Sequence, residues 1–285
     1  MVLAYACVTH GPRWVQYPPW ISTICLGDAQ VEGALNLRDL APEWNAHHPV
    51  LGGTAGTFAL KNLVATRTPA ATHVGLCQYR KFVSNARISH RQAPSYKVMD
   101  VVASRDLGAD RLAAVMAPGD RDFLLAHPFT LSNSRKLDDY LGQFSRVHHV
   151  EDLLRFSAEA VEQQVLDKAE LEDFFGEDVL VPGGVELGVY AAPFWIATVT
   201  AIESVTRACV RRYPIARSGY AARAWGFCAE RLGSYLLLRH LRASEGGARH
   251  PRRLGWGRGG HWAKRFVGQL NLVVHDDAPD YAIGS

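Results

Sequence analysis

Short apolar runs separated by turn residues dominate the first part of the chain. Residues 2–8 (VLAYACV), 21–26 (ISTICL) and 74–77 (VGLC) have the length and composition of buried strands. Residues 55–64 carry partly periodic apolar positions, and Thr54 before them predicts the start of a helix. The predicted order of strand, strand, helix and strand is the beginning of an α/β sheet.

Helical periodicity takes over in the second half of the chain. Helices are predicted at 137–147, 150–171, 199–213 and 220–241. The last of these has an expected core stripe of Trp225, Cys228, Ala229, Leu232 and Leu236. Further short strands are predicted at 97–103, 123–125, 179–181 and 270–275. The stretch 83–118 is otherwise weakly patterned, and 186–196 is an apolar run that Pro193 interrupts.

The stretch 73–82, HVGLCQYRKF, is where an apolar strand ends in polar and charged residues. Gln78, Tyr79, Arg80 and Lys81 follow the strand directly. In open α/β sheets, ligands bind just beyond the carboxyl ends of the strands. Arg offers a planar fork of donors and Lys a point charge, so the pair suits a phosphate or pyrophosphate. The alternative is that both cations are the solvated end of an ordinary strand.

Positive charge is concentrated near the carboxyl end of the sequence. The net charge of the 285 residues is only +3, so nucleic-acid binding is not expected. Residues 244–265 nevertheless carry six Arg or Lys residues against Glu245 alone, with Trp256 and Trp262 among them. Three interpretations stay open: a lid over a phosphate, a patch for anionic lipid headgroups through 249–265, or a solvated loop.

The cysteine pattern indicates a reducing compartment, and the lack of long apolar segments indicates that no part of the sequence spans a membrane. Cys7, Cys25, Cys77, Cys209 and Cys228 are odd in number and form no CxxC pair, so we expect buried free thiols. The amino terminus does not have the pattern of a signal peptide, and no stretch is long enough to span a membrane. A cytoplasmic location is expected, at the inner face of the membrane if the basic segment binds lipid.

One acidic pair has the form of a metal site. Asp120 and Asp122 have the Asp-x-Asp spacing that binds a divalent cation bridging diphosphate oxygens. Metal pairs of this kind follow an apolar strand, whereas this one precedes it, and exposed Asp pairs are common in turns. A divalent metal, Mn or Mg, is therefore not favoured as a cofactor, and no metal ligand is assigned.

The predicted helix at 220–241 also carries charge away from its core stripe. Arg223, Phe227, Glu230 and Ser234 fall on a second face. The step from Arg223 to Glu230 nearly completes two turns, so both side chains point the same way. They are either solvated or line a cleft.

Five segments, in order along residues 2–241, carry a resemblance to a known family. They are Thr9-His10-Gly11, Leu60-Lys61-Asn62, Gly75-Leu76-Cys77-Gln78-Tyr79-Arg80-Lys81-Phe82, residues 187–196, and Arg223-Ala224-Trp225-Gly226-Phe227-Cys228-Ala229-Glu230-Arg231-Leu232. Together they resemble a bacterial family catalogued as domain of unknown function 4422, associated with glycosyltransferases of capsule and O-antigen synthesis. The third and fifth segments are the specific ones. The chain departs from the family pattern in having Gln78 for His, Lys81 for Arg, Gly11 for Lys and Leu60 for Trp.

The resemblance implies a fold and a function. The implied fold is GT-A-like α/β, with a mixed, largely parallel sheet flanked by helices and a helical carboxyl-terminal half. Residues 1–243 would form a single domain, on which a basic Gly-, Arg- and Trp-rich loop and a final strand within 244–285 would pack. The implied activity is transfer of a hexose from a nucleotide sugar, a UDP-sugar, to a surface polysaccharide or other glycan acceptor.

The resemblance and the chemistry of sugar transfer together suggest roles for individual residues. Glu230 is expected to be the carboxylate that faces the acceptor or donor sugar, with Asp122 as the alternative. Cationic side chains are expected to neutralise the leaving diphosphate in place of a metal. Thr9 and His10 are expected at the base or ribose. The other expected donor-binding residues are Lys61, Asn62, Gln78, Tyr79, Arg80, Lys81, Arg223 and Arg231.

Two further functions are compatible with the sequence. Gln78 cannot titrate as the family's His does, which favours a catalytically degenerate protein that binds a nucleotide sugar or glycan. The Arg- and Trp-rich segment favours a polyanion- or membrane-surface-binding module. Titration with UDP-sugars combined with a hydrolysis assay distinguishes the first from an enzyme, and salt-sensitive liposome binding identifies the second.

Overall fold

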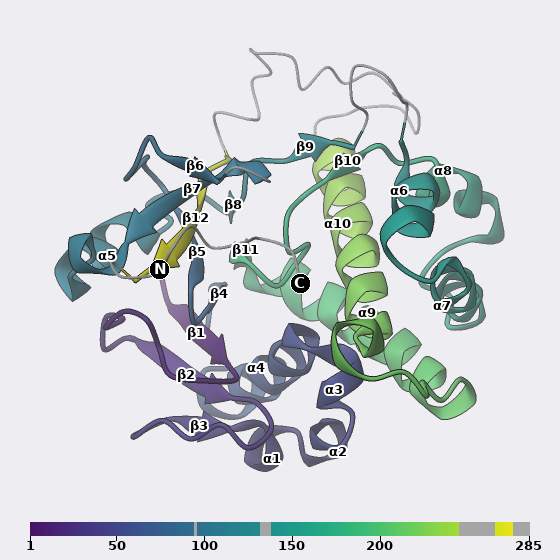
Figure 1. Cartoon of the computed structure of the whole chain (residues 1–285), viewed down its shortest axis with the longest axis horizontal. Coiled ribbons are helices and arrows are strands. Elements are labelled where there is room, and N and C mark those ends of the chain that lie inside the picture. Colours follow the sequence, from purple (N-terminus) through teal and green to yellow (C-terminus); the bar gives the residue numbers. More distant parts are fainter. Residues whose placement is uncertain (94–95, 132–137, 245–265, 276–285) are drawn as a thin grey trace.

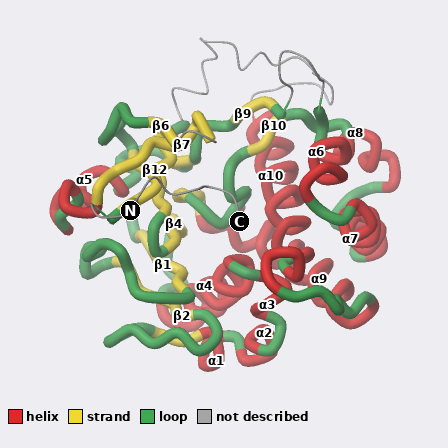
Figure 2. The backbone as a smooth tube through the Cα atoms, viewed as in Figure 1, coloured by secondary structure: helices red, strands yellow, loops and turns green. Residues whose placement is uncertain are grey.

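The computed structural model describes residues 1–93, 96–131, 138–244 and 266–275. A large mixed sheet occupies one side of the molecule, and helices α6 to α10 occupy the other (Figure 1). Figure 2 shows the same division, with α5 beyond the sheet on the side away from those helices.

The sheet has ten strands within the described residues, and its main path runs β3-β2-β1-β4-β5-β12-β7-β6. The strands of this path are β1 Leu3–Thr9, β2 Ile21–Cys25, β3 Leu35–Asn36, β4 His73–Gln78, β5 Lys81–Ser84, β6 Gln92–Ala93, β7 Tyr96–Ala103 and β12 Gln269–Val274. Off this path, β11 (Gly188–Ala191) pairs with β4 and with β8 (Leu124–Leu125). A separate two-stranded sheet joins β9 (Phe129–Thr130) and β10 (Val179–Leu180). β3, β2, β1 and β4 run parallel, as do β12 and β7, so the predicted mixed sheet is confirmed.

β1 separates two hydrophobic cores. Ala4, Ala6 and Val8 belong to the core shared with α4, α9 and α10, whereas Tyr5 and Cys7 belong to the core on the other face of the sheet. Successive side chains of a strand point to opposite faces, so a strand covered on both faces is apolar throughout. This is why the run at 2–8 shows no polar alternation.

Helices cover the sheet and form the second half of the molecule. α4 (Gly53–Arg67) packs on β1 so closely that a Cβ on Gly56 would lie 2.4 Å from Cγ1 of Val8. α9 (Ala192–Arg212) packs against α10 (Ala224–Ser244), α7 (Val150–Glu162) and α4. The remaining helices are α1 Leu37–Leu40, α2 Pro42–Asn45, α3 His48–Leu51, α5 Ala109–Met116, α6 Tyr140–Val147 and α8 Leu171–Phe175, with 3-10 turns η1 Ser104–Asp106, η2 Lys168–Glu170 and η3 Gly219–Ala222.

α10 is buried on more than the predicted stripe. All five stripe residues are buried, as expected. Ser234, which the periodicity assigned to the polar face, is fully buried as well. Its hydroxyl oxygen accepts hydrogen bonds from the Tyr140 hydroxyl at 2.8 Å and from the Val181 backbone N–H at 2.9 Å. Contacts from α6 and from the segment after β10 therefore cover this part of the helix.

Three segments differ from the sequence-based prediction. The apolar run at 186–196 is divided between two elements, because β11 ends at Ala191 and Pro193 lies in the first turn of α9, where its missing N–H costs nothing. The weakly patterned stretch contains α5, which buries Leu112 and Met116. The final strand β12 lies within the sheet, between β5 and β7. Residues 245–265 lie outside the described residues, so the three interpretations of the basic segment stay predictions.

The connectivity of the sheet reverses between β1 and β4. From β1 the chain continues to β2 and β3 on one side, whereas β4, on the other side of β1, leads to β5. Such a reversal opens a crevice outside the carboxyl ends of the two strands, where ligands bind in open α/β sheets. Thr9 and Gln78 are the last residues of the two strands and mark this position.

Candidate active site

The turn between β4 and β5 places an aromatic side chain and a cation at the reversal. Gln78 and Lys81 pair across the turn, so Tyr79 and Arg80 form its tip. The guanidinium carbon of Arg80 lies 5.3 Å from the centre of the Tyr79 ring and 5.7 Å from that of Trp14. Cation–π contacts of this kind hold the guanidinium in a defined position.

His10, His48 and Arg223 approach the same turn from three other segments. The rings of His10 and Tyr79 meet edge to face, with centres 4.8 Å apart. Partial burial lowers the pKa of His10, and the neighbouring Arg223, His48 and Arg80 lower it further. Cations that disfavour one another's charge in this way would be stabilised by a bound anion.

Arg223 reaches the amino end of α4. A Cβ on Gly52 would lie 3.5 Å from Cδ of Arg223, and Gly52 has a φ of +58°, which favours glycine. The amino end of this 15-residue helix carries a partial positive charge that adds to the charge of Arg223. Both features favour a negatively charged ligand.

Glu230 of α10 lies beside these cations. Its Oε1 accepts a hydrogen bond from the Gly183 backbone N–H at 2.8 Å, and its Oε2 accepts one from Nη1 of Arg231 at 2.8 Å. Burial and the charge of Arg80 lower the pKa of Lys81, whereas the charge of Glu230 raises it. Arg80, Lys81 and Glu230 therefore lie close enough to affect one another's charge.

Arg231 supports Glu230 rather than facing the crevice. Its side chain is buried, its Nη2 donates to Oε1 of Gln143 at 2.8 Å, and its guanidinium carbon lies 5.6 Å from the centre of the Phe144 ring. The expected role in donor binding is therefore corrected to a positioning role.

Glu186 joins this group, and the sequence did not predict it. Its carboxylate accepts a hydrogen bond from the hydroxyl of Thr54, which was expected to cap the helix. A Cβ on Gly53 would meet Oε2 of Glu186 at 3.1 Å and the amide nitrogen of Gln78 at 3.5 Å. Burial, with a smaller contribution from the charge of Glu230, raises the pKa of Glu186 to about 8 despite the Thr54 bond. The one sequence signal was a Glu at the start of an apolar run, since a carboxyl there indicates a site.

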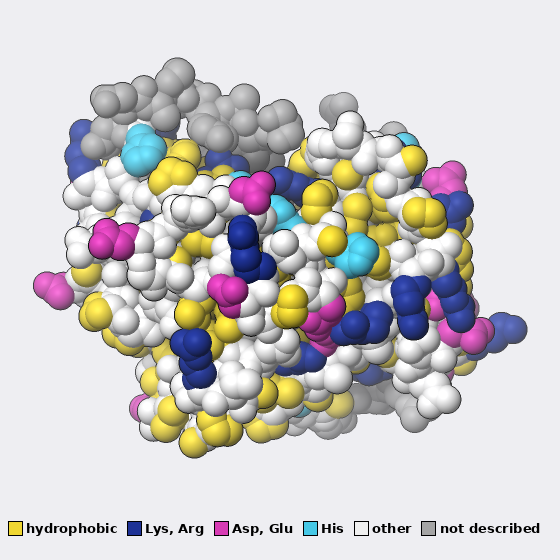
Figure 3. Space-filling view, turned by 90° about the horizontal axis from the view of Figure 1, so that it is seen from below, with side chains coloured by type: hydrophobic (Ala, Val, Ile, Leu, Met, Phe, Trp, Pro, Cys, Tyr) yellow, Lys and Arg dark blue, Asp and Glu magenta, His cyan; other side chains and the backbone are white. Residues whose placement is uncertain are grey.

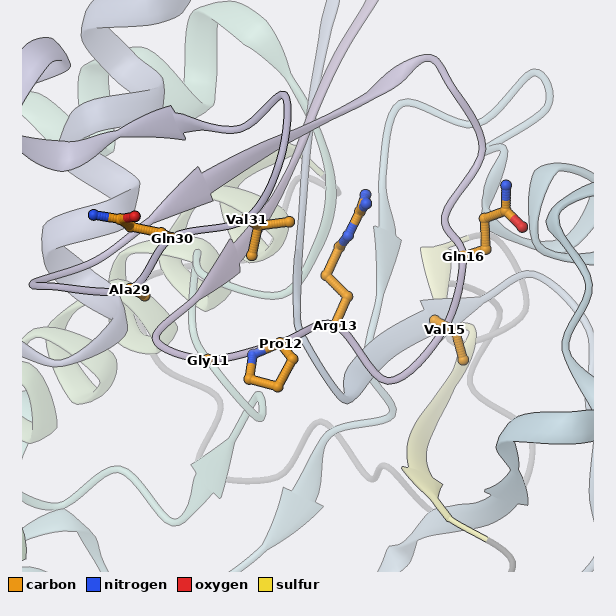
Figure 4. A pocket seen from close by; sticks show the side chains of 8 residues that line it. All are labelled: Gly11, Pro12, Arg13, Val15, Gln16, Ala29, Gln30 and Val31. Atoms are coloured by element: carbon orange, nitrogen blue, oxygen red, sulfur yellow. The ribbon is translucent and has the colours of Figure 1, made fainter.

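A cavity of about 660 Å³ opens beside the loop that contains Trp14, and Figure 4 shows the side chains that line it. Two loops that follow β1 and β2 line it with Gly11, Pro12, Arg13, Val15, Gln16, Ala29, Gln30 and Val31. Trp14 lies within the first loop, with its ring centre 6.0 Å from that of Tyr79 and 4.5 Å from that of His275. A cavity of this size with aromatic groups beside it fits a nucleoside.

Three of the predicted donor-binding residues have structural partners instead. Thr9 is fully buried, and its hydroxyl bonds the backbone of Gly11 to close the turn after β1. Lys61 forms an ion pair with Glu203 of α9, and Asn62 donates a hydrogen bond to the Leu40 carbonyl at 2.9 Å. These residues hold the fold together around α4 and β1. A helical Lys or Asn looks the same in a sequence whether its partner is a ligand or another helix.

Asp122 lies at the wrong end of the sheet for the predicted role. β11 is antiparallel to both β4 and β8, and it pairs Ala191 with His73 and Val189 with Leu124. Asp122, which comes just before β8, is therefore level with the amino end of β4. The charged group lies beyond the carboxyl end of β4. The prediction of Asp122 as the alternative catalytic carboxylate is therefore withdrawn.

Several whole-chain features frame the site. The five cysteines are buried free thiols, as expected. Within the described ranges, no cluster of three or more His, Cys, Asp or Glu side chains is arranged to hold a metal ion, and no helix has the length and apolar character to cross a membrane. On the face drawn in Figure 3, acidic and basic side chains are interspersed, with His side chains among them.

The architecture is similar to that of a known enzyme. It matches the apo structure of WbbM, a bifunctional glycosyltransferase, with a TM-score of 0.65 and 12% sequence identity. The fold is GT-A-like. The match covers 95% of this chain and 45% of WbbM, so the chain spans less than half the length of that protein. No protein-family model and no curated protein matches the sequence.

Proposed function

We propose that this protein is a glycosyltransferase that moves a hexose from a nucleotide sugar, a UDP-sugar, to a surface polysaccharide or another glycan. The observation that carries the proposal is the meeting of Arg80, Lys81 and Arg223 with Glu230 and Glu186 at the reversal of the sheet. The likeness in fold to WbbM supports it. Membership of the family catalogued as domain of unknown function 4422, a role in capsule or O-antigen synthesis and a cytoplasmic location belong to the same proposal.

The cations would act on the leaving group. Transfer breaks the bond between the anomeric carbon and the diphosphate, which leaves negative charge on the terminal phosphate oxygen. Arg80, Lys81 and Arg223 would neutralise that charge as it develops. Because side chains supply the positive charge, donor binding is expected without a divalent metal.

The nucleoside would extend from the diphosphate into the 660 Å³ cavity. Trp14, in a loop that lines the cavity, and the neighbouring Tyr79 and His10 offer aromatic surfaces close to Arg80. A planar base stacks on such surfaces, and the polar groups of Arg13 and Gln30 at the cavity wall can bond its edge.

Glu230 would handle the acceptor proton. A new bond forms between an acceptor oxygen and the anomeric carbon, and the acceptor hydroxyl loses its proton in the same step. Glu230 is half-buried and is held by Arg231 and the Gly183 N–H, so its carboxylate is oriented to receive that proton. Glu186 is mainly protonated at neutral pH, so it can donate a hydrogen bond to a sugar hydroxyl.

Release of UDP from UDP-galactose and UDP-glucose, in EDTA and with a panel of saccharides, tests this proposal. We expect turnover of one donor by the natural protein. Glu230→Gln is expected to lower kcat by about 100-fold or more with little change in UDP affinity. Asp122→Asn, at the other end of the sheet, is the matched control and should keep full activity. UDP binding without turnover would instead identify a catalytically degenerate binding protein.

A further inference from the structure

A second aromatic cluster borders Glu230 and has no part in the chemistry described above. It consists of Tyr220 in η3, Phe227 in α10 and His148 directly after α6. The rings of Phe227 and His148 are stacked, with centres 4.1 Å apart and 21° between their planes. The Tyr220 ring centre lies 4.9 Å from that of Phe227. The three rings form one continuous surface.

This cluster is accessible to solvent. The side chain of Tyr220 is 53% exposed, and Phe227 and His148 are each half-buried. Contiguous exposed apolar groups, unlike single scattered ones, are typical of interaction sites. The exposed end of the cluster is therefore a candidate contact for a ligand.

The cluster lies beside the reacting carboxylate. Phe227 precedes Glu230 by one turn of α10, on the same side of the helix. The guanidinium carbon of Arg223 lies 5.9 Å from the centre of the Tyr220 ring. Partial burial raises the pKa of Tyr220, and the charge of the nearby Glu230 raises it further.

The cluster is held from behind by the residues that position Glu230. The ring centre of His148 lies 4.7 Å from that of Phe144, and Phe144 in turn carries the guanidinium of Arg231. Arg231 bonds directly to Glu230 at 2.8 Å. Aromatic surface and carboxylate are thus fixed relative to each other by one buried Arg.

The chemistry of the cluster suits a sugar. A pyranose has an apolar C–H face that packs on aromatic rings and hydroxyls that need both donors and acceptors. Burial and the charge of Arg231 lower the pKa of His148 to about 4, so its ring is neutral at pH 7 and offers one donor and one acceptor. Glu230 and Arg223, next to the rings, supply an acceptor and a donor. An apolar peptide or a lipid chain would leave these polar groups unpaired.

We propose that Tyr220, Phe227 and His148 form the subsite for the acceptor saccharide, in which a pyranose ring stacks with one hydroxyl directed at Glu230. The inference rests on the proposed transferase function, because Glu230 is taken to be the reacting carboxylate. It adds the class of group that the acceptor must present at the end that reacts: a pyranose ring with an apolar face that stacks on the aromatic side chains.

Binding of simple glycosides tests the subsite separately from donor binding. The probes are the methyl α- and β-pyranosides of galactose and glucose, measured by saturation-transfer NMR with UDP present, while UDP affinity is measured by calorimetry. We expect at least one glycoside to bind the natural protein. Tyr220→Ala and Phe227→Leu should weaken that binding at least tenfold with unchanged UDP affinity. Tyr220→Phe, which keeps the ring, and Trp20→Ala, an exposed aromatic at the start of β2, are the controls.

The outcomes separate the two proposals. Equal glycoside affinity in the natural protein, Tyr220→Ala and Phe227→Leu overturns the subsite and leaves the transferase proposal intact. A natural protein that binds UDP but none of the glycosides also overturns the subsite. Failure to bind any uridine nucleotide overturns the proposed function instead. If Tyr220→Ala lowers the melting temperature, Phe227→Leu decides, because it keeps an apolar side chain and removes the aromatic face.

Discussion

At the scale of single residues, the pKa of Glu186 depends strongly on the surroundings of its carboxyl group. This group is partly buried between the start of α4 and the turn before β11, where fewer waters stabilise its charged form. The same burial that makes it a candidate donor of a hydrogen bond to the sugar also makes folding sensitive to pH, because the unfolded chain has no such environment.

Glu186 predicts a loss of stability as pH rises. Its folded pKa is raised to about 8, whereas an unfolded Glu titrates near about 4.3, so the folded state binds more protons between these values. The contribution of Glu186 to the free energy of unfolding should therefore be largest near pH 4 and should fall as the pH approaches 8. Glu186→Gln removes the effect, so its melting temperature relative to the natural protein should increase from pH 5 to pH 8. Glu32→Gln, in the exposed loop after β2, is the control. Parallel melting curves for all three proteins would contradict the assignment.

Substitution of Lys61 is expected to lower stability without changing donor binding. Lys61→Ala leaves Glu203 largely buried without its closest cation, which should cost up to about 3 kcal/mol in the free energy of unfolding. UDP affinity should not change, because the charged group lies at the amino end of α4, whereas Lys61 lies in the second half of that helix and pairs with Glu203. Chemical denaturation and calorimetry measure the two quantities. A fall in UDP affinity without a fall in stability would restore Lys61 to the donor site.

At the scale of elements, α10 positions Arg223 and Glu230 because it packs closely on α3. A Cβ on Gly226 would lie 2.2 Å from the Leu51 carbonyl oxygen, so no larger residue fits without moving the helix. Arg223 and Glu230 flank this glycine, and any displacement of α10 moves both away from the turn between β4 and β5.

Gly226→Ala should therefore damage both fold and site. We expect a loss of about 1–3 kcal/mol in the free energy of unfolding from overpacking, together with weaker donor turnover. Gly108→Ala is the matched control, since nothing lies within 4 Å of its added Cβ and its φ of −80° suits alanine. Its stability should stay within about 0.5 kcal/mol of the natural value. Equal stability of the two variants would contradict the close approach of α10 to Leu51.

Features that depend on a single strand or helix could be predicted from the sequence, whereas contacts between distant elements could not. The strands β1, β2 and β4 and the charged end of β4 were predictable, because buried parallel strands read as apolar runs and their ends as abrupt changes to polar residues. Glu186 was not, because its neighbours Thr54 and Gln78 are distant in the sequence. The boundary between β11 and α9 was not predictable either, because a helix that begins directly after a strand forms one apolar run with it in the sequence. Lys61, Asn62 and Asp122 were assigned by motif, and a motif does not reveal which partner a side chain finds.

At the scale of the whole molecule, β12, which comes last in the sequence, is an interior strand of the sheet. It runs between β5 and β7, pairing with both. Its residues Leu270, Leu272 and Val273 belong to the same core as Tyr5 and Cys7 of β1. The last strand is thus part of the packing that supports the first, although the chain between Ser244 and Phe266 is not described.

This arrangement predicts one cooperative unfolding transition. Leu272→Ala removes buried contacts in β12 and should cost about 2–5 kcal/mol in the free energy of unfolding. Far-ultraviolet circular dichroism and tryptophan fluorescence should shift together, because the loss is felt by the whole fold. Two separate transitions, with only the first affected, would show that β12 and the helical half unfold independently.

The central claim is that the cations at the reversal of the sheet hold the diphosphate of a nucleotide sugar. The most direct test is calorimetric titration of UDP and UDP-sugars, in EDTA, into the natural protein, Arg80→Ala and Arg67→Ala. Arg67 is exposed at the opposite end of α4 from the site and serves as the control cation. We predict metal-independent binding that Arg80→Ala weakens at least tenfold and Arg67→Ala leaves unchanged. Absence of binding, binding that requires manganese, or equal affinity in the natural protein and Arg80→Ala would contradict the claim.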